Sequence, residues 1–239
     1  MPHLINILVL TYNCLNSIKK HIEHLYKNTT HSDFKLFILD NGSIDGTVEH
    51  LKEVNNLHDN LYINFQESNL GIIKGRNKCY EFSKSVDSSC PYIIFLDADQ
   101  IVQEGWLENY LELIKEGHDL IGAEAWVMRQ KDFYPYKKIK SKNEEFNYCG
   151  AGGMMMKNDL FEKLGKFDED YNFMYFEDPS LCFLANVKGY KIGWNYNSVI
   201  IHDHKGSLLN NETRKYFMSN WKKFQEKWRG HKMPVFKMK

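Results

Sequence analysis

The stretch Tyr92-Ile93-Ile94-Phe95-Leu96-Asp97-Ala98-Asp99, residues 92–99, decides the fold class of this chain. Residues 92–96 are apolar and rich in β-branched and aromatic side chains, which is typical of a strand buried in a parallel sheet. The carboxylates of Asp97 and Asp99 follow directly, at the edge where open α/β sheets bind ligands. An Asp-x-Asp pair also occurs in ordinary turns, but its position after a buried strand favours a ligand site.

Strand and helix signals alternate in the part of the chain that precedes this stretch. Short apolar runs predict strands, and apolar residues at helical spacing, such as Ile18, Ile22 and Leu25, predict the helices between them. This alternation predicts an α/β fold with a Rossmann-like, mostly parallel central sheet flanked by helices. We expect strands over residues 5–10, 36–39, 61–65 and 92–96, and helices near 18–25, 47–54 and 74–85.

The second half of the chain has a less regular pattern. The segment that begins at Pro179 and is followed by Gly189 has the proline-first, glycine-after signature of a helix, with Asp178 as its expected N-cap. We also expect helices over residues 106–114, 159–164 and 216–228, strands over 120–128 and 199–201, and a long loop over 129–147.

The composition of the 239 residues is that of an ordinary globular protein, with 43% hydrophobic and 26% charged residues. Lys and Arg together number 31, as do Asp and Glu, so the formal net charge is zero. This balance argues against the broad basic surface that binds nucleic acid, and we expect no nucleic-acid partner.

The cysteines and the N-terminal residues bear on the compartment. The cysteines are scattered, odd in number and lack CxxC spacing, which argues against a disulfide framework or a zinc site and favours a reducing cytoplasm. Met1-Pro2-His3 leads into a strand-like segment without signal-peptide features, and no apolar run approaches the roughly 18 residues that span a bilayer. We expect a cytoplasmic protein, whose contact with the inner face of a membrane would be peripheral.

Polar residues also follow the first two predicted strands. Thr11-Tyr12-Asn13 ends the first strand, and Asp40-Asn41-Gly42-Ser43 ends the second. Asn-Gly is a strong turn former, and Asp45 or Thr47 can cap the next helix. A turn does not require an acid at position 40, however, so Asp40 is a candidate for ligand binding.

The segment around the third helix has two interpretations. Asn69-Leu70-Gly71 precedes Gly75-Arg76-Asn77. Glycines near a helix start let backbone amides approach a phosphate, and Arg76 can pair with it. A glycine-permitted turn with a solvated Arg76 explains the same residues equally well.

Two acidic and histidine-rich segments complete the candidates. Glu177-Asp178 stands at a predicted helix start, where an N-cap can also serve in catalysis. His202-Asp203-His204 follows the strand over residues 199–201, and one of its histidines could join Asp99 in holding a divalent cation such as Mg²⁺ or Mn²⁺. A single surface histidine more often binds no metal, so ligation stays open on these residues alone.

In their order and spacing, these motifs resemble those of glycosyltransferase family 2, which are inverting enzymes of the GT-A fold. The resemblance covers roughly residues 5–207. It implies a single catalytic domain over 1–239, with a nucleotide-sugar-binding half at about 1–100, an acceptor and catalytic half at about 101–207, and a C-terminal helical segment at 208–239. The motifs that carry it are Thr11-Tyr12-Asn13, Asp40-Asn41-Gly42-Ser43, Asp45-Gly46-Thr47, Asn69-Leu70-Gly71, Arg76-Asn77, Asp97-Ala98-Asp99, Gly152-Gly153, Glu177-Asp178, and His202 with Ser207.

The resemblance also implies roles for individual residues. Asp99 would bind the metal directly, with His202 as its second protein ligand, although His204 leaves that choice open. Asp178 would be the general base, with Glu177 as the alternative holder of that role. The implied donor-binding residues are Thr11, Tyr12, Asn13, Asp40, Asn69, Gly71, Arg76, Asp97, Ala98, Gly152 and Gly153. Among these, Gly152 and Gly153 would shape the floor where donor sugar meets acceptor. A Pro directly after Glu177-Asp178 departs from the usual polar residue.

The implied reaction is transfer of a sugar, with inversion, from a nucleotide-diphosphate sugar, by resemblance a UDP-sugar. Its acceptor would be a hydroxyl of a glycan, a lipid-linked glycan or a protein. Two alternatives remain open: a sugar nucleotidyltransferase, whose glycine-rich basic loop is missing after residues 5–10, and a catalytically silent binding module. The basic, aromatic segment 216–228 would pack on the domain itself or dock on a membrane or partner.

Overall fold

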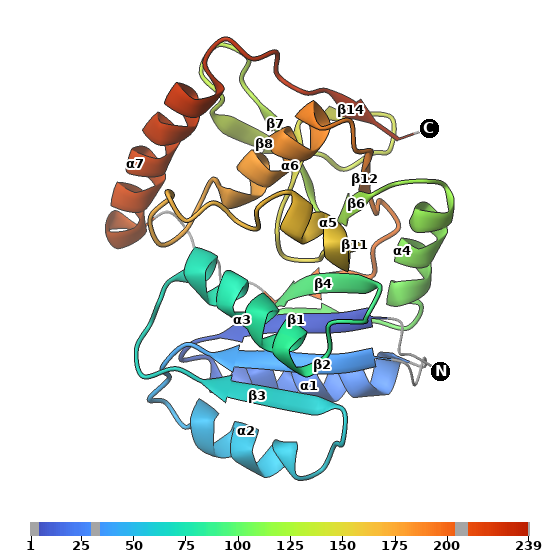
Figure 1. Ribbon diagram of the computed structural model, residues 1–239, viewed down its shortest axis with the longest axis vertical. Coiled ribbons are helices and arrows are strands. Elements are labelled where there is room, and N and C mark those ends of the chain that lie inside the picture. The colour runs from blue at the N-terminus through green and yellow to red at the C-terminus, as the bar shows by residue number, and fades with distance from the viewer. Residues whose placement is uncertain (1–4, 30–33, 204–209, 239) are drawn as a thin grey trace.

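The computed structural model describes residues 5–29, 34–203 and 210–238. Its centre is a seven-stranded sheet in the order β12-β6-β11-β4-β1-β2-β3 (Figure 1). Every neighbouring pair is parallel except those made by β11, which runs antiparallel to both β4 and β6. The predicted mostly parallel sheet flanked by helices is therefore confirmed. The strands are β1 (Ile5–Thr11), β2 (Phe34–Asp40), β3 (Leu61–Phe65), β4 (Tyr92–Asp97), β6 (Leu120–Gly122), β11 (Met154–Lys157) and β12 (Ile192–Trp194).

The first half of the chain follows the predicted alternation of strand and helix. The helices are α1 (Leu15–Asn28), α2 (Thr47–Asn55) and α3 (Ile72–Val86). Helix α1 buries Ile18, Ile22 and Leu25, the apolar residues whose spacing predicts it. Their burial against the sheet holds the helix in place, because helical stability in proteins comes mostly from packing of the apolar face.

The second half combines helices with small sheets, and it continues the central sheet beyond β4 with β11, β6 and β12 (Figure 1). Its helices are α4 (Trp106–Lys115), α5 (Asn158–Lys163), α6 (Glu177–Val187) and α7 (Asn211–Trp228). A three-stranded sheet, in the order β10-β7-β8, contains β7 (Ala125–Met128), β8 (Pro135–Lys138) and β10 (Tyr148–Cys149). Two further pairs join β5 (Gln100–Val102) to β13 (Ile200–His202) and β9 (Glu145–Phe146) to β14 (Phe236–Lys237).

Two sequence-based expectations for this half are wrong in detail. The strand expected over residues 120–128 is split into β6 and β7, which belong to different sheets. The loop expected over residues 129–147 contains β8 and β9. These strands exist because β8 pairs with the nearby β7 and β9 pairs with the distant β14. Whether a segment forms a strand depends on its pairing partner, and a distant partner leaves no periodicity in the local sequence.

Helix α7 begins earlier than expected, at Asn211 rather than near residue 216. The side chain of Asn210 caps it by accepting hydrogen bonds from the backbone amides of Glu212 and Thr213. Within the part of the chain that the structure describes, neither α7 nor any other helix has the length and apolar character to cross a membrane.

Strand register brings the polar residues of the first half to one edge of the sheet. Thr11 at the end of β1 lies opposite Asp40 at the end of β2, and Leu10 lies opposite Asp97 at the end of β4. Because β11 is antiparallel, its first residue Met154 lies opposite Phe95, so the preceding glycines reach the same edge. This alignment brings the polar residues from several strands together at the carboxyl edge of the sheet.

Candidate active site

A cavity of about 1490 Å³ lies at the carboxyl edge of the sheet. It gathers residues from both halves of the chain, from Leu10 to Phe217. Asp40 and Gly153, both expected in the donor site, are not among its lining residues. The expected site residues that line it are Thr11, Tyr12, Asn13, Asn69, Gly71, Arg76, Asp97, Ala98, Asp99, Gly152, Glu177, Asp178 and His202.

Asp97, Asp99 and His202 form a cluster that could hold a metal ion, with ligand atoms that all lie within 4.8 Å of one another. His202 Nε2 lies 3.1 Å from Asp99 Oδ1 and 3.8 Å from Asp97 Oδ2. Pairing of β13 with β5 sets His202 opposite Gln100 and so beside the acidic pair. Two carboxylates and one imidazole suit Mn²⁺, and the carboxylates also suit Mg²⁺. The alternative ligand His204 lies outside the described residues.

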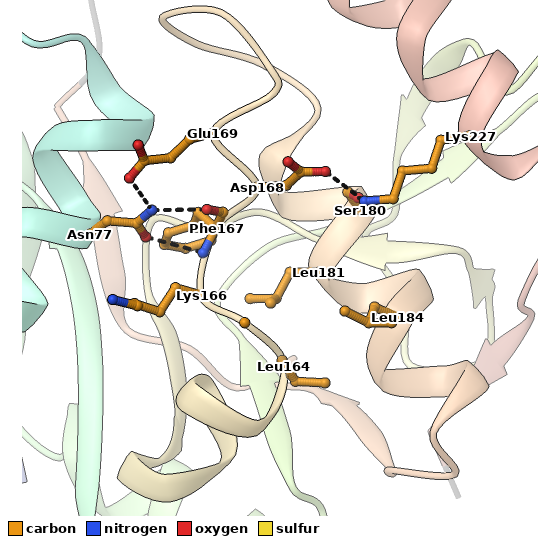
Figure 2. A pocket seen from close by; sticks show the side chains of 11 residues that line it. Asn77, Leu164, Lys166, Phe167, Asp168, Glu169, Ser180, Leu181, Leu184 and Lys227 are labelled. Carbon is orange, nitrogen blue, oxygen red and sulfur yellow. Dashed lines mark hydrogen bonds and ion pairs between the residues drawn. The ribbon is translucent and has the colours of Figure 1, made fainter.

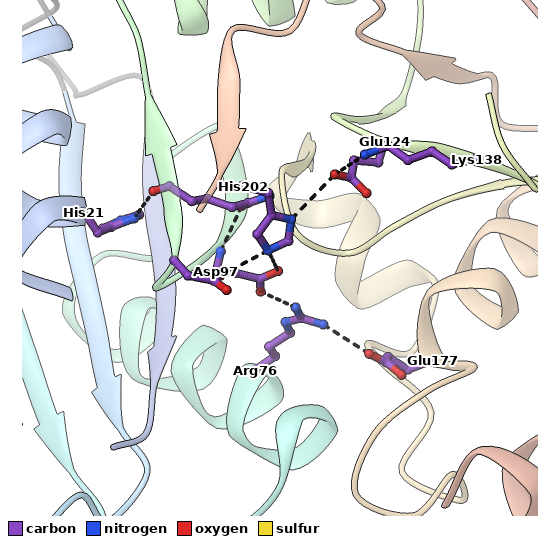
Figure 3. A network of polar contacts seen from close by, with 9 residues as sticks. His21, Arg76, Asp97, Glu124, Lys138, Glu177 and His202 are labelled. Atoms are coloured by element: carbon purple, nitrogen blue, oxygen red, sulfur yellow. Dashed lines mark hydrogen bonds and ion pairs between the residues drawn. The ribbon is translucent and has the colours of Figure 1, made fainter. Parts of the chain in front are cut away.

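Glu124 extends this cluster, although no sequence motif singles it out. Its Oε1 atom lies 3.6 Å from His202 Nδ1 and 2.6 Å from Lys138 Nζ (Figure 3). A carboxylate on the far nitrogen of a metal-binding histidine fixes the orientation of the ring. The available signal was its position just after the end of β6, at the same edge of the sheet as Asp97.

The charges of Glu124 and His202 stabilise each other. Burial would raise the pKa of Glu124, but hydrogen bonds from His202 and Lys138 outweigh it and lower that pKa to about 2. Burial would lower the pKa of His202, but hydrogen bonds with Asp99 and Glu124 outweigh it and raise that pKa to about 10. The cluster therefore holds a proton on His202 where a bound cation would displace it.

Arg76 connects the cation cluster to the second pair of acids. Its Nη2 atom lies 2.5 Å from Asp97 Oδ1, and its Nη1 atom donates to Glu177 Oε1 at 3.1 Å (Figure 3). The guanidinium is buried, and although burial lowers its pKa, the charges of Asp97 and Glu177 outweigh that effect and raise it. Arg76 is thus a fixed cation in the middle of the cavity wall.

Glu177 and Asp178 lie in the first turn of α6, which corrects the expected N-cap. The helix begins at Glu177 with Phe176 as its N-cap residue, and no side chain caps it. The backbone of Phe176 is left-handed, so the chain enters the helix two residues earlier than Pro179 indicated. Pro179 is accommodated because amides of the first turn lack intrahelical acceptors.

The two acids differ in what surrounds them. Glu177 is buried against Arg76, and its Oε2 atom has no hydrogen-bond partner among the described residues. Burial and the charge of Glu177 together raise the pKa of Asp178 well above its usual range, and Arg76 opposes them only in part. Asp178, half-buried on the cavity wall, is therefore the better proton acceptor of the pair.

Glycines allow close approaches at this site. A Cβ atom on Gly152 would lie 2.2 Å from Asp97 Oδ2, so any side chain there would displace the carboxylate. A Cβ atom on Gly71, whose φ is +82°, would lie 2.8 Å from the carbonyl oxygen of Phe173. Gly153 combines a φ of +79° with a Cβ position 2.5 Å from that of Ala123. Gly153 thus allows a tight backbone path beneath the cavity and does not form part of the cavity surface.

Asp40 lies fully buried beneath the cavity. Its Oδ2 atom accepts a 2.9 Å hydrogen bond from the Ser43 amide, whereas Oδ1 is buried without a partner among the described residues. The neighbouring Asn41 fixes the next loop, because its side chain donates to Asn69 Oδ1 and accepts from the Leu70 amide, both at 2.9 Å. The Asp40 segment thus combines an unpaired acceptor with a structural anchor.

The loop that enters α6 is conformationally strained. Phe173, Tyr175 and Phe176 have φ values of 61°, 76° and 73°, a region that bulky residues rarely adopt. Each such residue costs about 1–3 kcal/mol and persists only where surrounding contacts enforce it. The Glu177-Asp178 pair is therefore presented by a segment that needs outside support.

Comparison with known structures identifies the fold class. A structure of GalNAc-T7 with UDP, GalNAc and Mn²⁺ superposes with a TM-score of 0.78 at 15% identity, covering 96% of this chain and 49% of that one. A structure of S. aureus TarS 1-349 in complex with UDP gives a TM-score of 0.62 at 17% identity, covering 82% and 59%. The protein has the GT-A fold, as the sequence predicted.

Sequence comparison then identifies the family. The model of the glycosyl transferase family 2 matches residues 6–179, and the chain belongs to this family. It is 25% identical over 173 residues to the glycosyltransferase AglE of Haloferax volcanii, covering 68% of this chain and 55% of AglE. It is 24% identical over 148 residues to TuaG of Bacillus subtilis, described as a putative teichuronic acid biosynthesis glycosyltransferase, covering 62% and 56%. The chain thus spans about half the length of these curated relatives.

Proposed function

We propose that this protein is an inverting glycosyltransferase that moves a sugar from a UDP-sugar to an acceptor hydroxyl with the help of a divalent cation. One observation carries the proposal. The Asp97–Asp99–His202 cluster and the carboxyl of Asp178 line the same cavity, with Arg76 between the two acidic groups. Such a site offers separate places for a leaving diphosphate and for proton transfer.

The donor side of the cavity is suited to a nucleotide diphosphate. A bound Mn²⁺ or Mg²⁺ supplies a Lewis acid that neutralises charge on the departing diphosphate. Asp99 and His202 would hold that ion, and Asp97 would hold the ion or the ribose. Arg76 adds a fixed positive charge nearby, which favours an anionic leaving group in a site that is only partly open to water.

Asp40 lies beneath the cavity, so its proposed contact with the nucleotide base requires the groups that cover it to move when the donor binds. Its buried Oδ1 atom is an unused acceptor, and a buried acceptor is stabilised by gaining a donor. The N–H of a uracil ring is a donor of the required kind. Thr11 and Tyr12, which line the cavity next to this strand end, would complete the base and ribose contacts together with Asn13, Asn69 and Gly71.

Asp178 would act as the general base. Its raised pKa makes the carboxylate basic enough to accept the proton of the attacking hydroxyl, and such catalysis contributes about 10²–10⁴-fold. Glu177 is less suited, since its Oε1 atom is bound to Arg76. Attack on the anomeric carbon from the face opposite the diphosphate gives inversion.

We propose that the acceptor is a hydroxyl of a glycan, a lipid-linked glycan or a protein, within glycan or cell-surface polysaccharide biosynthesis. The description of TuaG as a teichuronic acid biosynthesis glycosyltransferase supports that setting. The cysteines Cys14, Cys79, Cys90, Cys149 and Cys182 are all free thiols, which supports action in the reducing cytoplasm, peripheral to the inner face of the membrane.

A screen of nucleotide sugars with Mn²⁺ or Mg²⁺ tests the proposal by measuring release of the nucleotide diphosphate. We expect cation-dependent release of UDP from at least one UDP-sugar. Absence of release from every nucleotide sugar would support the silent binding module instead. Release of pyrophosphate from UTP and a sugar 1-phosphate would establish the sugar nucleotidyltransferase.

A further inference from the structure

Asn220, in the middle of α7, is fully buried and bonds almost entirely to the loop that enters α6. Its Nδ2 atom donates to the carbonyl oxygens of Asn172 and Met174, both at 2.8 Å, and to that of Tyr175 at 3.2 Å. Its Oδ1 atom accepts from the Asn172 amide at 2.9 Å. One side chain thus bonds to the backbone of Asn172, Met174 and Tyr175.

These peptide groups belong to the strained segment described above. Two of the bonded carbonyls, those of Asn172 and Met174, flank the left-handed Phe173, and the third belongs to the left-handed Tyr175 itself. Asn220 thus supplies contacts that keep Phe173 and Tyr175 in unfavourable conformations. The same segment also reaches the donor side of the cavity. The carbonyl oxygen of Phe173 accepts from the amides of Ile72 at 2.7 Å and Ile73 at 3.3 Å, in the first turn of α3.

Further contacts bind α7 to this segment and to α6. The ring of Tyr216 stacks on Phe173 with centroids 5.0 Å apart, and that of Phe217 packs against Phe176 at 5.2 Å. At the other end of α7, Lys227 Nζ donates to Asp168 Oδ2 at 2.6 Å and to Ser180 Oγ at 3.1 Å (Figure 2). In Figure 1, α7 accordingly lies beside the loop and α6.

The chemistry of Asn220 separates positioning from simple packing. A helix that only covered an apolar surface would place an apolar side chain there, because burying an amide is unfavourable unless its hydrogen bonds are made. Here the amide is buried and its bonds go to backbone groups that immediately precede Glu177 and Asp178. The arrangement specifies the path of the loop rather than adding to the core.

We infer that Asn220 is a positioning residue, which holds the loop over residues 172–176 so that Asp178 faces the cavity at the correct distance from the donor. The inference rests on the proposed function, because it takes Asp178 as the base. It goes beyond the family match, which ends at residue 179, and gives the C-terminal helix a part in the reaction. Asn220 acts through the loop and does not line the cavity.

The test compares Asn220→Ala and the isosteric Asn220→Asp with a matched control, Asn158→Ala. Asn158 is also a buried asparagine, and its Nδ2 atom donates to the Cys90 carbonyl at 2.9 Å, away from the cavity. The measurements are the maximal rate of UDP release from the UDP-sugar found in the screen, the Kd of UDP with Mn²⁺, and hydrogen exchange of residues 171–178. Asp178→Asn is measured in parallel.

We expect both Asn220 variants to lower the rate of UDP release about 10- to 100-fold, as a small misplacement of a reacting group does. The Kd of UDP should stay within about twofold, and exchange should rise in residues 171–178 but not in β1 and β4. Asn158→Ala should leave rate and local exchange close to those of the unchanged protein. If Asn220→Ala fails to fold, Asn220→Asp provides the same test, because it keeps the volume and the acceptor but loses the donated bonds.

Three results would overturn the inference. They are an unchanged rate in the Asn220 variants, an equal loss of rate in Asn158→Ala, and a loss of rate without a local rise in exchange. A normal rate in Asp178→Asn would instead reject the assignment of the base. The failure of the proposed function and the failure of this inference are therefore distinguishable.

Discussion

Arg76 donates a 3.1 Å hydrogen bond to Glu177, a residue 101 positions later in the chain. Because the other end of the same guanidinium contacts Asp97, the bond ties the acids that end β4 to the acids that begin α6. The positive charge of Arg76 thereby offsets part of the repulsion between the carboxylates of the proposed donor site and those at the start of α6. A single planar guanidinium therefore bridges the two acidic groups.

Asp178→Asn should abolish most transfer while leaving donor binding intact. The amide keeps the shape of the side chain but cannot accept the proton, so the rate should fall by about 10²–10⁴-fold. The Kd of UDP in the presence of Mn²⁺, measured by calorimetry, should change by less than about twofold. Asp170→Asn, at an exposed position of the same segment, is the control. Near-normal transfer by Asp178→Asn would eliminate this residue as the base.

Asp99→Ala and His202→Ala should each weaken the dependence of UDP binding on the cation. Both remove a ligand atom from the cluster within 4.8 Å. A titration of Mn²⁺ against UDP affinity should shift to higher concentrations in both variants, and the exposed Asp59→Ala should leave it unchanged. If the titration of His202→Ala matched that of the unchanged protein, His202 would not be a ligand, and His204→Ala would be the next variant to measure.

Glu124→Gln should lower metal affinity without removing a ligand. The carboxylate of Glu124 approaches His202 Nδ1 to 3.6 Å, and loss of such an outer partner typically costs about 10–100-fold in affinity or activity. The Mn²⁺ titration measures this directly, and Glu145→Gln on the exposed end of β9 serves as the control. An unaltered titration would mean that Glu124 does not orient the histidine.

Gly152→Ala should disturb the donor site more than Gly150→Ala does. The new methyl group would lie 2.2 Å from Asp97 Oδ2 in the first variant, whereas in the second its nearest neighbour would be 3.8 Å away. Displacement of Asp97 should weaken Mn²⁺-dependent UDP binding by about tenfold or more, because site geometry is sensitive to shifts of about 1 Å. Equal affinities in the two variants would show that Asp97 moves aside freely.

His21 should make the protein less stable in mild acid. Burial lowers the pKa of this fully buried imidazole to about 4, below its usual value of 6.5. The unfolded chain therefore binds more protons between these values, and the free energy of unfolding should fall as pH drops from 6.5 towards 4. The free energy of unfolding, measured by denaturant titration at several pH values, should fall less steeply with decreasing pH in His21→Gln than in the unchanged protein. The exposed His231→Gln is the control. An equal pH dependence of stability in His21→Gln and the unchanged protein would show that His21 is not the source of this effect.

Local sequence patterns were sufficient for much of the fold. The alternation before Asp97 predicted the central strands and helices, because the apolar residues that mark each of them are buried in the common core. The same patterns could not predict β9, whose partner β14 lies far away in the chain, and they also missed β8, which pairs with the nearby β7. Asp178 was misread as an N-cap, since the left-handed Phe176 that starts α6 leaves no mark in the sequence.

The candidate site divides in the same way. Residues at or just after the ends of strands, such as Thr11, Asp97 and Asp99, could be selected because the edge of a parallel sheet is predictable. Glu124 and Asn220 could not, because each acts on another residue and carries no motif of its own. Asp40 and Gly153 were selected for the site and lie just beneath its surface. Residues that line the site are therefore easier to predict from the sequence than residues that hold them in place.

The pairing of β13 with β5 has a consequence for the order in which the site is built. Asp99 is synthesised first, whereas His202, which meets it at 3.1 Å, is made 103 residues later. A growing chain that has already formed the β1–β4 sheet would hold the carboxylates without the imidazole. Capture of a cation by the complete cluster would therefore wait until residue 202 has been made, and a product that ends before it would carry only the two carboxylates.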